Sequence, residues 1–106
     1  MKVVYHHRYE EVYISDPAAK AGRMEAILNE VSPHFEMVTA EPSVVDDIRL
    51  VHSDEHIEDI QSMGLTYELA LLAAGGAIRT AELALDGEPS FGLIRPPGHH
   101  ASRSHC

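Results

Sequence analysis

The stretch Phe91-Gly92-Leu93-Ile94-Arg95-Pro96-Pro97-Gly98-His99-His100-Ala101 decides how the rest of this sequence is interpreted. It places a short apolar run directly before a turn that carries two adjacent histidines. The two prolines fix φ and remove two backbone donors, so neither a strand nor a helix continues through them. Gly98 allows the backbone to approach another group closely. Because imidazole has an ordinary pKa of about 6.5 and both accepts and donates protons, a rigid pair predicts acid/base chemistry.

Short apolar strands alternate with helices upstream of this turn. Runs rich in β-branched and aromatic residues predict strands, and apolar residues at helical spacing predict helices. The expected strands are residues 2–5, 35–39 and 91–94, and the expected helices are residues 23–31, 43–50, 53–63 and 66–86.

Capping residues set the expected helix boundaries. Asp16 followed by Pro17 is typical of a helix N-terminus, and Ser53 is expected to cap its own helix. Ser43 with Asp46 resembles a capping box, and Thr66 is expected to cap the longest helix. That helix is expected to end near Asp86, with Gly87 as the residue that follows its C-cap. Its two interior glycines, at positions 75 and 76, predict close packing, because each costs about 1 kcal/mol relative to alanine.

This alternation of strands and helices predicts an α/β fold with a parallel sheet and helical crossovers. In open sheets of this kind, functional sites form beyond the carboxyl ends of the strands. The loop over residues 6–15 and the turn that begins at Arg95 are therefore expected at the same rim of the sheet.

Composition limits the classes of function. The chain has 106 residues, of which 44% are hydrophobic, and its formal net charge is −9. Such an acidic chain repels a phosphate backbone, so direct nucleic-acid binding is not expected, whereas cationic substrates are favoured. The longest apolar run is too short for a membrane span, and the N-terminus does not resemble a signal peptide. The single cysteine, Cys106, is expected to be a free thiol, and we expect a cytoplasmic protein.

Residues 95–101 match the signature of the zinc-dependent deacetylases, which include histone deacetylases, acetylpolyamine amidohydrolases and acetoin-utilisation proteins. Three further segments support this resemblance. Residues 51–57 resemble the family's Val-His-Ser-x-Glu-Tyr-Ile segment, with His56 in place of the aromatic residue. Residues 74–87 resemble the helix before the signature strand, and residues 16–24 resemble the first loop. The connection over residues 62–66 departs from the family, which usually has a longer substrate loop there.

The resemblance implies a fold and a set of site residues. The family has the three-layer arginase-deacetylase α/β fold, so residues 1–106 are expected to form the N-terminal portion of such a domain, with about the first three strands. His99 and His100 correspond to its general acid/base pair, neither of which is a metal ligand. Arg23 corresponds to an arginine that lines the acetate channel, and we assign Gly98 to the same substrate and product channel. The implied substrates are acetyl-lysine or acetylpolyamines.

The resemblance also implies zinc in the complete family domain, held by an Asp-x-His pair and a distant Asp. No position of this chain corresponds to those ligands, so the chain alone is expected to bind no zinc tightly and to be inactive. A partial parallel sheet leaves edges uncovered, so we expect a homo-oligomer, most simply a dimer.

Other interpretations stay open. His52-Ser53-Asp54-Glu55-His56 fits the His-x-x-Glu-His metalloprotease pattern, although His52 falls before the expected helix. Arg23 is equally explained as a surface arginine at a helix terminus. The side chains of the first loop either line the mouth of the site or belong to a solvated loop: His6, His7, Tyr9 and Tyr13. The chain as a whole could instead be a non-catalytic, self-associating α/β module that retains a relict motif.

Overall fold

A computed structural model describes residues 1–105, and Cys106, with the free thiol expected there, lies outside the described residues. Three strands form one parallel sheet in the order β2-β1-β3. They are β1 (Lys2–Tyr5), β2 (Glu36–Thr39) and β3 (Ser90–Gly92). β1 is central, with Val4 paired to Val38 on one side and to Gly92 on the other. The predicted parallel α/β fold is confirmed.

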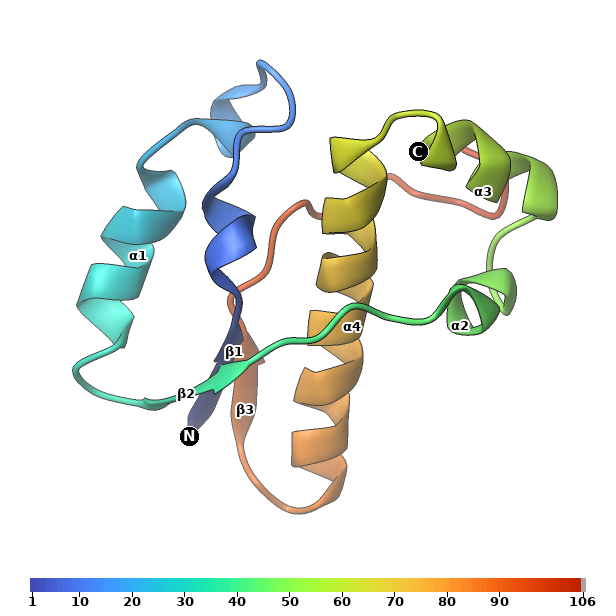
Figure 1. Cartoon of the computed structure of the whole chain (residues 1–106). Coiled ribbons are helices and arrows are strands. Elements are labelled where there is room, and N and C mark those ends of the chain that lie inside the picture. The colour runs from blue at the N-terminus through green and yellow to red at the C-terminus, as the bar shows by residue number, and fades with distance from the viewer. Residues whose placement is uncertain (106) are drawn as a thin grey trace.

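Helices lie on both sides of the sheet. In Figure 1, α1 (Arg23–Val31) lies to one side of the strands and α4 (Leu65–Leu85) to the other. Two short 3₁₀ helices, η1 (His7–Glu10) and η2 (Pro17–Ala19), connect β1 to α1. Between β2 and α4 the chain forms α2 (Val45–Arg49) and α3 (Asp54–Gln61). This arrangement is a partial three-layer fold.

The core lies where β1 meets α4. Val3 and Val4 are fully buried, because both faces of a central parallel strand are covered by helices. Apolar side chains from α1, α4 and the loops complete the cluster: Tyr9, Met24, Ala40, Leu69, Leu72, Leu83 and Leu93. No helix among residues 1–105 is long and apolar enough to cross a membrane.

The two glycines inside α4 allow the close packing predicted from the sequence. A Cβ at Gly75 would collide with the backbone of Glu41 and Ser43, and a Cβ at Gly76 would collide with the Tyr9 hydroxyl. The segment that leaves β2 crosses α4 here, held by the Ser43 amide, which donates to the Leu71 carbonyl at 2.9 Å. The neighbours of both glycines lie in the segments that follow the strands, whereas the sequence predicts packing on the sheet itself.

Two predicted caps are confirmed and two are wrong. The Ser53 hydroxyl accepts from the His56 amide at 3.2 Å, and Gly87 has the left-handed φ of +87° expected after a helix C-cap.

Ser43 does not form a capping box, because its amide donates to the Leu71 carbonyl of α4 and Val44 is the N-cap of α2. Thr66 lies inside α4, because Gly64 at φ +61° turns the chain sharply enough for the helix to begin at Leu65.

Asp16 caps a shorter element than expected. Its carboxylate accepts from the Ala18 amide at 2.7 Å, and Pro17 opens η2 rather than a long helix. Gly22, at φ +86°, separates η2 from α1, which begins at Arg23 as the sequence predicts. The chain therefore changes direction twice between β1 and α1, which brings backbone carbonyls of both 3₁₀ helices toward the rim of the sheet.

Candidate functional site

The two histidines occupy a turn beyond the carboxyl end of β3. The Ala101 amide donates to the Gly98 carbonyl at 2.9 Å and closes this turn around them. The imidazole rings of His99 and His100 lie with centroids 4.3 Å apart and planes inclined by 53°. Both side chains are exposed within the described part of the chain. Their proximity allows a proton acceptor and a proton donor to act on one bound molecule.

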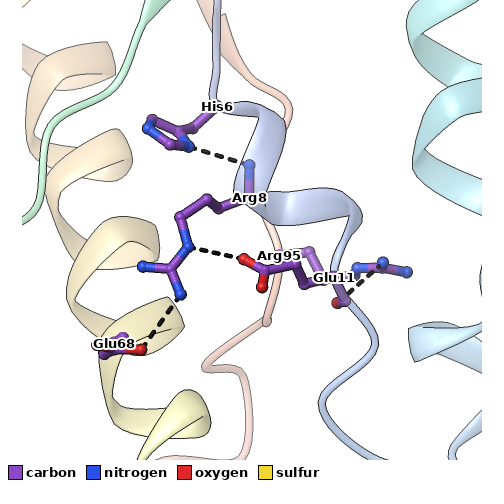
Figure 2. A network of polar contacts seen from close by, with 5 residues as sticks. All are labelled: His6, Arg8, Glu11, Glu68 and Arg95. Atoms are coloured by element: carbon purple, nitrogen blue, oxygen red, sulfur yellow. Dashed lines mark hydrogen bonds and ion pairs between the residues drawn. The ribbon is translucent and has the colours of Figure 1, made fainter.

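The loops after β1 and β3 meet at the same rim, as predicted. The ladder extends one step past β3, because the Leu93 amide donates to the Val4 carbonyl at 2.9 Å. Beyond this point the side chain of Arg95 extends to the first loop, where it donates to the backbone carbonyls of Tyr9 and Glu11; Figure 2 shows the contact with Glu11. Arg95, at the start of the segment that leads to the histidine turn, thus contacts η1 and η2, whereas the turn itself borders the groove beside α3 and α4.

Arg95 is the residue that joins these loops, although its position in the sequence did not suggest a role. The residue is 3% exposed, and its guanidinium donates to four backbone carbonyls. The acceptors are Tyr9 at 2.8 Å, Lys20 at 3.2 Å, Ala18 at 3.3 Å and Glu11 at 3.4 Å. The guanidinium also lies over the Tyr13 ring, 5.9 Å from its centroid. The sequence signal that could have indicated a buried arginine is its position between an apolar run and two prolines.

A second arginine ties η1 to α4 at the surface. Figure 2 shows Arg8 between Glu11, at 2.7 Å from its Nε, and Glu68, at 3.2 Å from its Nη2. The same figure shows His6, whose Nδ1 accepts from the Arg8 amide at 3.0 Å and caps η1. Partial burial, and then the nearby His7 and Arg8 charges, lower the pKa of His6. The cap requires a neutral imidazole, because Nδ1 must be unprotonated to accept this hydrogen bond.

Tyr9 is a core residue, so neither interpretation of the first loop holds for it. It is fully buried, and its hydroxyl donates to the Leu72 carbonyl of α4 at 2.6 Å. Burial raises its pKa to about 12, which keeps the phenol protonated. His6 and Tyr13 are half-buried and His7 is exposed. Sequence spacing gave no warning of this burial, because Tyr9 lies within a short polar segment.

The hydroxyl of Tyr5 lies at the end of β1 in a buried polar region. Within the described residues neither this hydroxyl nor Oε1 of Glu25 has a hydrogen-bond partner. Burial, followed by the charges of Glu10 and Glu25, raises the pKa of Tyr5 well above its ordinary value. Tyr5 is thus a neutral phenol beneath the rim.

The two residues assigned to a channel lie at the surface of the described chain. Arg23 is exposed at the start of α1, and its Nη1 donates to the Ala18 carbonyl at 3.1 Å. Gly98 is exposed in the histidine turn, and a Cβ there would meet no described atom within 4 Å. The close approach expected at Gly98 is therefore absent from residues 1–105, and the channel role stays a prediction.

The second histidine pair lies at α3 and shares a groove with the segment that carries the histidine turn. His52 precedes the helix, as expected, yet its ring lies 5.2 Å from the ring of buried His56. Both line a largely apolar groove of about 490 Å³ between α3, α4 and the segment from Ile94 to Ala101. No group of three potential metal ligands exists among residues 1–105, so the metalloprotease pattern lacks a third ligand there.

Comparison with known proteins identifies deacetylases as relatives. A probable deacetylase of Methanothermobacter thermautotrophicus is 36% identical in an alignment that covers 77% of this chain and 30% of the relative. Histone deacetylase 8 of Arabidopsis thaliana is 31% identical over 67% of this chain and 24% of its own length. The chain thus spans less than a third of either relative. No family model matches it.

A solved structure supports the fold. The crystal structure of the HDA15 HD domain superposes with a TM-score of 0.83 over 99% of this chain and 38% of that one. The sequence identity is 22%, so this likeness concerns the fold alone. The expectation of a partial deacetylase-type α/β fold, drawn from the signature turn, is confirmed.

Proposed function

We propose that this chain, which belongs to the histone deacetylase superfamily, supplies the proton-transfer residues of a zinc-dependent amidohydrolase that removes acetyl groups from amines. The observation that carries the proposal is the histidine turn, which holds His99 and His100 together at the carboxyl ends of the parallel strands. That edge is where open α/β sheets bind their ligands.

Amide hydrolysis needs two proton transfers that this pair can perform. One imidazole takes a proton from the attacking water, and the other gives a proton to the departing amine nitrogen. The two rings are close enough for one to contact the attacking water while the other contacts the nitrogen of the same amide. Their exposure leaves room for a substrate. In this proposal, His99 and His100 are the general acid/base residues, and Arg23 and Gly98 belong to the channel for the acetate product.

The proposed substrates are cationic amines. The chain carries a net charge of −9, which raises the local concentration of positively charged molecules near its surface. Acetylpolyamines keep at least one protonated amine beside the secondary amide, and acetyl-lysine peptides are positively charged where other lysine or arginine side chains flank the amide. Direct binding to nucleic acid or to a membrane is not part of the proposal, and a cytoplasmic location stays a prediction.

The residues described here do not form a zinc site. Residues 1–105 contain no group of three potential ligands, whereas a catalytic zinc is usually held by three protein side chains. We therefore propose that the ligands lie outside this chain, and that the chain alone neither retains zinc nor hydrolyses acetylated amines.

A chimera tests the proposal. Residues 1–106 replace the matching segment of the Methanothermobacter relative, and hydrolysis of an acetyl-lysine peptide and of acetylputrescine is measured. We expect the chimera to retain one zinc after dialysis and to hydrolyse at least one substrate, while the 106-residue chain alone does neither. A zinc-loaded, active 106-residue chain would contradict the division of roles. So would a folded, zinc-loaded chimera without activity, provided that the unaltered relative is active.

Self-association is the second candidate function. β2 and β3 are the outer strands of the described sheet, and Phe91 on β3 is 54% exposed. Unpaired strand edges invite pairing with another chain, most simply in a two-fold dimer. Light scattering after size exclusion tests this expectation. A monomer at micromolar concentration that unfolds cooperatively would show that the chain closes its own core and would remove this candidate.

A further inference from the structure

The charge of Arg95 is buried without a carboxylate. The residue is 3% exposed, and none of the ion pairs among residues 1–105 includes it. Because a guanidinium does not lose its proton in proteins, this positive charge must be stabilised by dipoles. Backbone carbonyls supply them, as Figure 2 shows for Glu11.

The four carbonyls come from the ends of the two 3₁₀ helices. Tyr9 and Glu11 belong to the last turn and the C-cap of η1. Ala18 and Lys20 belong to the last turn and the C-cap of η2. Carbonyl oxygens at a helix C-terminus have no N–H donor within the helix and carry partial negative charge. The planar guanidinium of Arg95, whose N–H donors point in several directions, therefore binds the C-terminal ends of both η1 and η2.

The same contact reaches the start of α1. The Ala18 carbonyl accepts from Nη1 of Arg95 at 3.3 Å and from Nη1 of Arg23 at 3.1 Å. The arginine assigned to the channel and the arginine that precedes the histidines thus share one acceptor. Arg95 therefore joins the start of the segment that leads to the histidine turn to η1, η2 and the N-terminus of α1.

The other end of the histidine turn is held separately. The Arg103 carbonyl accepts from the Ser53 amide at 2.9 Å, at the N-cap of α3. Between these anchors, the Gly98 carbonyl and the Ala101 amide close the turn. The two histidines consequently lie on a short span fixed at Arg95 on one side and at Arg103 on the other.

We infer that Arg95 is a positioning residue that holds the His99–His100 turn in place through its hydrogen bonds to the carbonyls of η1 and η2. Lysine cannot replace it, because an ammonium group offers three donors from one point and lacks the flat, forked geometry. The inference deepens the proposed function and rests on it for its catalytic meaning, but the geometry is measurable in the 106-residue chain without any activity.

The first test uses the unaltered chain. We expect the Nε–H proton of Arg95 to exchange with solvent much more slowly than that of exposed Arg79, and to show nuclear Overhauser contacts to residues 9–20. An Nε–H of Arg95 that exchanges as fast as that of Arg79 would overturn the inference. This measurement decides the matter even if every variant at position 95 fails to fold.

The second test uses Arg95→Lys and Arg95→Ala, with Arg79→Lys as the matched control. In the folded Arg95 variants, backbone amides of the histidine turn and of η2 should exchange about 10- to 100-fold faster, the range expected when a charged hydrogen bond is lost. The imidazole signals of His99 and His100 should shift, and those of His34 should not. Ethylguanidinium, but not ethylammonium, should restore the signals of Arg95→Ala.

Unchanged histidine signals in folded Arg95→Lys would overturn the inference, and so would equal rescue by both cations. These outcomes are independent of the chimera. An inactive chimera with the expected Arg95 signals would refute the proposed function alone, whereas an active chimera with unchanged signals would refute the positioning role alone.

Discussion

Gly75→Ala should destabilise the chain, although alanine is the better helix former. On helix propensity alone the change stabilises by about 1 kcal/mol. In the structure the new Cβ collides with the Glu41 carbonyl oxygen and lies 2.8 Å from the Ser43 amide nitrogen, and both atoms are backbone. Relief requires the segment after β2 to move away from α4.

The magnitude follows from two losses. Overpacking of this kind costs about 1–3 kcal/mol. The movement also weakens the hydrogen bond from the Ser43 amide to the Leu71 carbonyl, which is worth about 1 kcal/mol. After the propensity gain is subtracted, the free energy of unfolding should fall by about 1–3 kcal/mol.

Urea denaturation followed by far-ultraviolet circular dichroism measures this change. Ala81→Gly, at an exposed position of the same helix, is the control, and it should destabilise by about 1 kcal/mol through propensity alone. A Gly75→Ala chain that is more stable than the original by about 1 kcal/mol would refute the close crossing of α4 by the segment after β2.

Two further predictions concern the first loop. Tyr9→Phe removes the hydroxyl that donates to the Leu72 carbonyl and should lower the free energy of unfolding by about 1 kcal/mol in urea, whereas Tyr67→Phe should change it little; equal effects would contradict the buried role of Tyr9. Because the pKa of His6 is lower in the folded chain, its contribution to stability is full above the unfolded pKa of about 6.5 and declines as the pH falls below that value. His6→Asn keeps a capping side chain that does not titrate, so the urea midpoint of this variant should fall less between neutral and mildly acidic pH than that of the original chain. Identical pH profiles of the two urea midpoints would exclude the His6 cap as a titrating contact.

Much of the fold could be predicted from local signals. The strands at residues 2–5 and 36–39 are β-branched or apolar runs, and the helical spacing of α1 and α4 has few competing interpretations. Ser53 and Gly87 act through local geometry, so their roles follow from the sequence alone. The parallel sheet follows in turn from the alternation of strands and helices.

The errors arise where distant segments decide the local structure. Ser43 fails as a cap because α4 uses its amide, and Thr66 fails because a left-handed glycine at position 64 starts the helix earlier. Tyr9 is buried by α4, which is separated from it by more than fifty residues in the sequence. None of these contacts has a periodic signature in the sequence.

The candidate site was predictable only in part. The signature turn predicted His99 and His100 as candidate site residues beyond the carboxyl end of a strand, and the structure places both residues after β3. Arg95 belongs to the same signature, yet its role depends on carbonyls at residues 9–20, whose approach depends on two 3₁₀ helices that the sequence did not predict. A backbone acceptor has no side-chain identity, so such a partner leaves no trace in the sequence pattern.

The central claim is that His99 and His100 are the proton-transfer residues of an amidohydrolase. The most direct test is kcat/KM for an acetylated amine, measured for the zinc-loaded chimera and for its His99→Ala, His100→Ala double variant. Loss of one proton-transfer group costs about 10²–10⁴-fold in rate, so the double variant should lose at least that factor at unchanged zinc content. A double variant as active as the parent chimera would contradict the assignment of both residues.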